Sequence, residues 1–177
     1  MHKWKKYIAE GMKDILFEER ISKVKIESDF RNQYLSAGFT EVISPELIKI
    51  LMEMGHGDEI IISDGNFPAA AFANRLVRAD GHNVPELLDA ILQFFPLDPY
   101  VENPVSLMQV VPGDTVKTPI WEEYRAIVKK HDANFKDFES VERFAFYERA
   151  KKVYAVVATG ESALYANIIL KKGVVVE

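Results

Sequence analysis

One histidine of this chain lies where proton transfer to a ligand would be easy. His56 stands between Gly55 and Gly57, and Asp58 follows directly. Histidine exchanges protons near neutral pH, and flanking glycines allow a ligand to approach the imidazole closely. The same imidazole could instead bond to the last carbonyl groups of a preceding helix. The residues next to His56 leave both interpretations open.

The segments on either side of His56 indicate how it is positioned. Ser44 and Pro45 are typical of a helix start, the apolar residues after them recur on one helix face, and Gly55 can end that helix. Residues 59–63 then form an apolar run typical of a buried strand, and residues 64–68 are typical of a turn. His56 therefore precedes a core strand, and Asp64 follows it.

The rest of the chain alternates between strand and helix patterns. Strands are predicted near residues 76–78, 106–111, 154–159 and 167–170, and helices near residues 84–94, 119–130 and 146–152. Such alternation is typical of an α/β fold. We predict one domain over residues 41–177, with a central, mainly parallel sheet flanked by helices. Residues 1–40 differ in their dense charge and are predicted to form a helical extension, with Trp4, Tyr7, Ile8, Met12, Ile15 and Leu16 on one face.

Composition excludes several classes of function. The 177 residues contain no cysteine, so a disulfide framework, a thiolate nucleophile and a thiolate zinc site are excluded. A net charge of -5 argues against a nucleic-acid partner. Apolar runs are too short for a membrane span or a signal peptide, so we expect a cytoplasmic protein without a membrane partner.

Side chains that suit a neutral, polyhydroxylated ligand follow or precede the predicted strands. They are Asp64 and Asn66 after one strand, Arg143, and Tyr165 with Asn167 before the last strand. Carboxylate, amide, guanidinium and phenol groups together supply donors and acceptors for neighbouring hydroxyls. A phosphate-binding glycine loop, a serine elbow and a convergent metal-ligand set are lacking in the sequence. Each polar residue taken singly could equally belong to a turn, a cap or an ion pair.

Several ordered blocks of the sequence resemble one known family. They are Ile43–Leu47 (ISPEL), Met54–Ile60 (MGHGDEI), Ser63–Pro68 (SDGNFP), Arg78–Gly81 (RADG), Arg143–Ala150 (RFAFYERA) and Tyr165–Val174 (YANIILKKGV). From about residue 42 to residue 174 the chain resembles the fucose mutarotase and ribose pyranase family of small, cofactor-free sugar isomerases. The SDGNFP turn and the arginine at position 143 are similar to the fucose branch rather than the ribose branch.

The resemblance implies roles for particular residues. His56 would be the proton donor, and Asp64, Arg143, Tyr165, Ala166 and Asn167 would hold a free monosaccharide. No cofactor or metal would be needed. Family members form ring-like homo-oligomers, often decamers, with sites at subunit interfaces. Ribose pyranase activity, and a non-catalytic sugar-binding module, remain the alternatives to fucose mutarotation.

Mutarotation needs one group to protonate the ring oxygen and another to take the proton of the anomeric hydroxyl. We assign the first role to His56 and expect Asp64 to orient a hydroxyl or serve as the base. The two residues nevertheless lie at opposite ends of one predicted strand, and eight extended residues would span roughly 26 Å. Either the chain bends sharply near Gly57, or the site combines groups from two subunits.

Overall fold

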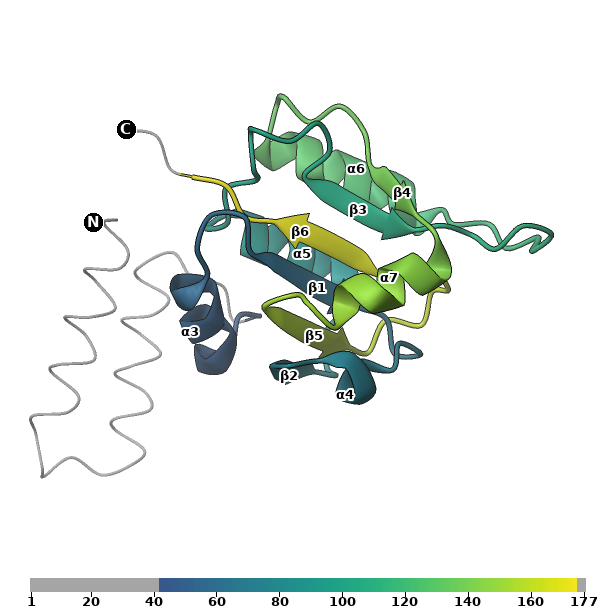
Figure 1. Cartoon of the computed structure of the whole chain (residues 1–177), viewed down its shortest axis with the longest axis horizontal. Helices are drawn as coiled ribbons and strands as arrows, with labels where there is room; N and C mark the ends of the chain where they lie inside the picture. The colour runs from purple at the N-terminus through teal and green to yellow at the C-terminus, as the bar shows by residue number, and fades with distance from the viewer. Residues whose placement is uncertain (1–41, 175–177) are drawn as a thin grey trace, which may run out of the picture. The chain divides into compact units, whose positions relative to one another are not determined.

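A computed structural model describes residues 42–174, and its core is one six-stranded mixed sheet (Figure 1). The strands are β1 (Glu59–Ser63), β2 (Leu76–Ala79), β3 (Val105–Met108), β4 (Glu139–Val141), β5 (Ala155–Thr159) and β6 (Ile168–Lys171). The helices of this region are α3 (Pro45–Glu53), α4 (Ala69–Phe72), α5 (Val84–Leu92), α6 (Ile120–His131) and α7 (Arg143–Ala150). The predicted helix in residues 1–40 lies outside the described residues.

The strand order is β2-β5-β1-β6-β3-β4, and β6 alone runs antiparallel to its neighbours β1 and β3. The prediction of a mainly parallel sheet flanked by helices is therefore confirmed. Because β1, β3 and β4 run in the same direction, the residues that follow them meet at one edge of the sheet. The start of β6 reaches that same edge, since β6 runs the opposite way. We call it the carboxyl edge, and the opposite one the amino edge.

Alternation along β1 explains how both faces of the sheet are covered. Ile61 packs in a cluster with Phe146 of α7, whereas Ile60 and Ile62 point to the other face. In Figure 1, α4 and α7 lie in front of the sheet and α5 and α6 lie behind it. All three isoleucines are fully buried, as a strand covered on both faces requires. The described part of the chain contains no helix with the length and apolar character needed to span a membrane.

The helix before His56 forms as its capping residues predict. The Ser44 side chain accepts a hydrogen bond from the backbone N–H of Leu47 at 3.1 Å, and Pro45 occupies the first turn. The helix ends at Glu53, one residue before its C-cap, Met54. Gly55 directly follows this C-cap, in agreement with its predicted place at the end of the helix. The turn continues to Gly57, whose φ of +85° is left-handed.

Four other elements differ from the prediction. Strand β3 ends at Met108 instead of continuing to residue 111. Helix α7 begins at Arg143, three residues earlier than predicted, because the Glu142 carboxylate accepts hydrogen bonds from the backbone N–H groups of Phe144 and Ala145. The short elements α4 and β4 were not predicted.

Candidate functional site

Asp64 is a buried carboxylate placed directly after β1. Its side chain is 4% exposed, and it accepts hydrogen bonds from the backbone N–H groups of Asn66 at 3.0 Å and Ala166 at 3.3 Å. Burial raises the pKa of Asp64 above its ordinary value, and these hydrogen bonds oppose the rise in part. A carboxylate kept out of water in this way is well placed to bind or deprotonate a hydroxyl group.

The segment before β6 supplies the partners of Asp64. The Asn167 amide donates from Nδ2 to Oδ2 of Asp64 at 2.8 Å, and its Oδ1 accepts the backbone N–H of Asp64 at 3.0 Å. This reciprocal pair exists because β6 runs antiparallel to β1, so that its first residues lie beside the last residues of β1. Ala166 and Asn167 are thereby held against Asp64, and Tyr165 directly precedes them in the chain.

Arg143 is the first residue of α7, just after β4, and lines the same place as Asp64 and Asn167. Its Nε is the one buried side-chain nitrogen or oxygen in residues 42–174 that lacks a hydrogen-bond partner. Its guanidinium lies over the ring of Phe144, 4.8 Å from the ring centre. A guanidinium could balance the charge of the buried Asp64 carboxylate, but within residues 42–174 the two side chains form no ion pair, and Asn167 binds that carboxylate. An unpartnered buried donor beside this cleft is available to an acceptor atom of a ligand.

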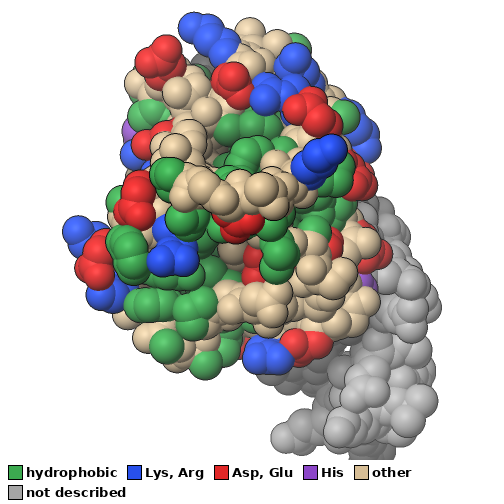
Figure 2. Space-filling model, turned by 90° about the vertical axis from the view of Figure 1, so that its right-hand side faces the viewer, with side chains coloured by type: hydrophobic (Ala, Val, Ile, Leu, Met, Phe, Trp, Pro, Cys, Tyr) green, Lys and Arg blue, Asp and Glu red, His purple; other side chains and the backbone are tan. Residues whose placement is uncertain are grey.

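These groups line one cleft of about 240 Å³ at the carboxyl edge. Its walls are formed by Asp64, Asn66, Phe67, Met108, Asp114, Arg143, Tyr147, Leu164, Tyr165 and Asn167. Figure 2 views this side of the molecule and shows hydrophobic side chains around a hollow in which acidic groups are visible. The volume is below the roughly 300–1,000 Å³ of pockets for drug-sized ligands, so the cleft suits a small polar ligand.

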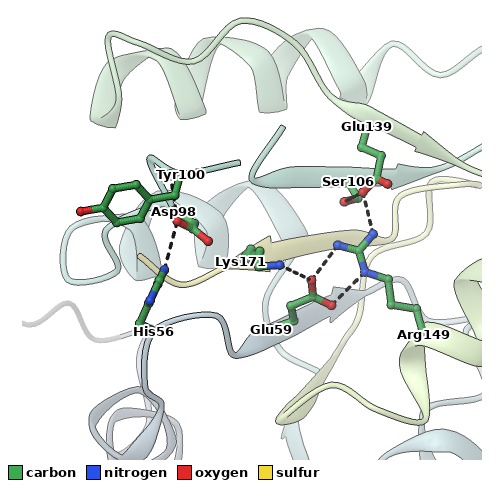
Figure 3. A network of polar contacts seen from close by, with 8 residues as sticks. All are labelled: His56, Glu59, Asp98, Tyr100, Ser106, Glu139, Arg149 and Lys171. Carbon is green, nitrogen blue, oxygen red and sulfur yellow. Dashed lines mark hydrogen bonds and ion pairs between the residues drawn. The ribbon is translucent and has the colours of Figure 1, made fainter. Parts of the chain in front are cut away.

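His56 lies at the amino edge and does not reach this cleft. Its Nε2 is 3.3 Å from Oδ1 of Asp98, a carboxylate that is 3% exposed, and its ring meets the ring of Tyr100 edge to face (Figure 3). The His56 side chain is 47% exposed. Although the backbone turns at Gly57, β1 alone separates the two ends by roughly 15 Å. One chain therefore does not bring His56 and Asp64 together.

Sequence patterns did not identify several residues of the cleft and of the surroundings of His56. Met108, Asp114 and Leu164 join the cleft from three separate segments, and Asp98 is the partner of His56. The glycine before Asp114 indicates a turn in the sequence. The contact between Asp114 and Tyr165, far apart in the chain, is what places this turn at the cleft. Within residues 42–174, no group of three or more histidine, aspartate or glutamate side chains is placed to hold a metal ion.

Comparison with known proteins identifies the family. Residues 38–175 match the RbsD / FucU transport protein family. The chain belongs to this family. It is 53% identical over 137 residues to the L-fucose mutarotase of Actinobacillus pleuropneumoniae serotype 5b, covering 77% of this chain and 95% of that protein. It is 51% identical over 142 residues to the fucose mutarotase of Mus musculus, with 77% and 92% covered.

A solved structure from the RbsD / FucU family has the same fold. The crystal structure of the fucose mutarotase from Streptococcus pneumoniae in complex with L-fucose is 55% identical, with a TM-score of 0.75. The alignment covers 78% of this chain and 98% of that one. The resemblance inferred from the motif blocks is thus confirmed.

Proposed function

We propose that this protein is an L-fucose mutarotase, an isomerase that interconverts the α and β anomers of L-fucose. The observation that carries the proposal is the convergence of Asp64, Arg143 and Asn167 on one small polar cleft. Relatives about half identical to this chain over most of its length are named fucose mutarotases, which supports fucose as the substrate. The cytoplasmic location remains a prediction from the sequence.

The reaction requires that a proton leave one oxygen of the sugar and reach another. When the anomeric hydroxyl loses its proton, the C1=O bond forms, the bond from C1 to the ring oxygen breaks, and the ring oxygen takes up a proton. Rotation about C1–C2 and the reverse transfers then close the ring on the other face. Asp64 is suited to the hydroxyl proton because burial raises the pKa of this carboxyl group. Arg143 offers donors that hold a hydroxyl in place.

His56 is proposed as the donor to the ring oxygen, supplied by a neighbouring subunit. Since His56 and the cleft lie at opposite edges of the same sheet, a head-to-tail contact would place the histidine of one copy at the cleft of the next. Exposed apolar side chains lie beside both groups. Tyr100 is 73% exposed next to His56, Leu164 of the cleft is 50% exposed, and Phe144, which contacts the Arg143 guanidinium, is 63% exposed. We propose a ring-like homo-oligomer, with a decamer as the expected size.

Saturation-transfer NMR on equilibrated α- and β-L-fucose tests the activity. The parent protein should accelerate exchange between the anomers, and His56→Ala should lose most of that acceleration. A parent that leaves the exchange rate at the buffer value would exclude mutarotase activity. Repeating the measurement with D-ribose separates fucose mutarotation from ribose pyranase activity, and binding without acceleration would indicate a sugar-binding module.

Mixed oligomers test the two-subunit site. A His56→Ala subunit retains an intact cleft, and an Arg143→Ala subunit retains His56. In a randomly mixed head-to-tail ring at equal amounts, about a quarter of the interfaces combine the intact histidine with the intact cleft. The mixture, refolded together, should therefore recover about a quarter of the parental exchange rate. A mixture no more active than its components would show that both groups must come from one chain.

A further inference from the structure

Tyr165 has an unusual backbone conformation for its size. Its φ is +57°, and among the described residues it is the one non-glycine residue with a positive φ. A bulky side chain rarely adopts this left-handed conformation, and such strain persists only where surrounding contacts impose it. Because Tyr165 lines the cleft, its conformation determines where the phenol group points.

Two side chains of α6 impose this conformation from the core side. The indole Nε1 of Trp121 donates to the backbone carbonyl of Tyr165 at 2.8 Å, and the hydroxyl of Tyr124 donates to the carbonyl of Ala166 at 2.9 Å. Tyr124 is fully buried, so its bond is shielded from water. Asp64 holds the N–H of Ala166 from the other side. The backbone of the segment is therefore fixed before any ligand enters.

The phenol group of Tyr165 is fixed as well, by a residue of a different loop. Its hydroxyl donates to Oδ2 of Asp114 at 2.7 Å. The other oxygen of Asp114, Oδ1, accepts the backbone N–H of Val116 at 3.1 Å and closes a tight turn after Gly113, whose φ is +90°. An ionised carboxylate has no hydrogen to donate, so the direction of the Tyr165 bond is settled: the phenol gives its hydrogen to Asp114.

We propose that Asp114 is a positioning residue that makes Tyr165 a hydrogen-bond acceptor toward the sugar. With its hydrogen held by Asp114, the phenol oxygen can only accept further hydrogen bonds. The backbone of Val111 supplies one of them, so a sugar hydroxyl that contacts the oxygen must donate to its remaining lone pair. This inference rests on the proposed binding of fucose in the cleft. It assigns Asp114 a role in selecting the orientation of a bound hydroxyl, without contact between its carboxylate and the sugar.

Asp114→Asn is the decisive variant because it changes one atom of the relevant contact. The amide oxygen can still accept the N–H of Val116, so the turn is kept, whereas the amide nitrogen in place of Oδ2 donates to the phenol. The phenol hydrogen must then turn toward the cleft. We expect KM and the dissociation constant for L-fucose to rise about 3- to 10-fold, the change that follows from loss of one hydrogen bond. The kcat should change less than twofold.

Tyr165→Phe and the double variant show whether Asp114 acts through Tyr165. In the Tyr165→Phe background, Asp114→Asn should alter the dissociation constant less than 1.5-fold, since no phenol remains to be oriented. The matched control is Asp132→Asn, where the carboxylate closes a similar turn by accepting the N–H of Asn134 but does not line the cleft. Its fucose affinity should equal that of the parent.

Measuring the dissociation constant by calorimetry separates this inference from the proposed activity. If the parent binds fucose without accelerating exchange, the mutarotase proposal fails and the Asp114 variants still decide the inference. If Asp114→Asn binds fucose like the parent, Asp114 merely shapes its loop and the inference is overturned. It is also overturned if the effect persists in Tyr165→Phe, because the carboxylate would then contact the sugar directly. A parent that does not bind fucose overturns both proposals.

Discussion

Replacing Arg149 by methionine is expected to lower the free energy of unfolding by about 2–3 kcal/mol. Arg149 on α7 donates from Nε and one terminal nitrogen to the Glu59 carboxylate at 2.8 and 2.7 Å, and from the other to Glu139 at 2.6 Å (Figure 3). Removing one member of a buried pair costs about 3–5 kcal/mol, since the remaining charge stays desolvated. Here Glu59 is 16% and Glu139 is 45% exposed, so water can solvate part of the network and the cost falls below that range.

Urea unfolding at pH 7 measures this effect. The control is Arg78→Met, which breaks a pair with Asp80 whose two side chains are 64% and 57% exposed, and should leave the midpoint of unfolding close to that of the parent. Adding Glu59→Gln to Arg149→Met should recover part of the loss, because it removes a half-buried carboxylate charge whose remaining ion pair, with Lys171, is long at 3.9 Å. A loss below about 1 kcal/mol for Arg149→Met, or no recovery in the double variant, would refute the view that this network fastens α7 to the sheet.

Two further predictions concern the backbone and the buried carboxylate. Gly160→Ala should destabilise the fold by about 1–3 kcal/mol, because a Cβ there would clash with the carbonyl oxygen of Asp80. The control is Gly81→Ala, where an added Cβ meets nothing within 4 Å, and it should be close to neutral in the same urea assay. The raised pKa of Asp64 means that its contribution to stability is full below its ordinary value of 3.8 and is lost as pH rises through the folded-state pKa. The stability of the parent relative to Asp64→Asn should therefore fall as pH rises from 3.8, and a difference that stays constant or grows would contradict the shift.

Local signals predicted the elements that have strong caps or long apolar runs. The limits of β1 were predicted to the residue because its isoleucines stand between a glycine turn and Asp64. Strand β4 was missed because it has three residues, two of them polar, and pairs on one side with β3 alone. The first turn of α7 was missed because its cap is Glu142, and glutamate is not among the side chains that usually cap a helix.

The candidate site could be predicted in part for a similar reason. Asp64 and Asn167 stand next to predicted strands, so their residue types and places suggested a shared site before any pairing was known. Asp114 could not be found in this way, since it belongs to a loop whose position follows from the bond to Tyr165, 51 residues away. Asp98 is likewise brought to His56 from 42 residues along the chain. Sequence patterns carry local geometry, but these contacts depend on tertiary packing.

The pairing of β1 with β6 fixes both halves of the proposed site at once. At one end, Asn167 just before β6 holds Asp64; at the other, the carbonyl of Lys172 just after β6 accepts the N–H of Gly57 at 2.8 Å, beside His56. Because Ile61 pairs with Ile169 in the middle, the length of two rigid strands sets the separation of the two halves. A ligand cannot shorten that distance by moving a loop. A head-to-tail ring requires two complementary surfaces on opposite edges of each subunit, and His56 and the cleft are placed in that way. Their fixed separation prevents a single chain from closing the proposed site. The same separation would make every interface of such a ring equivalent.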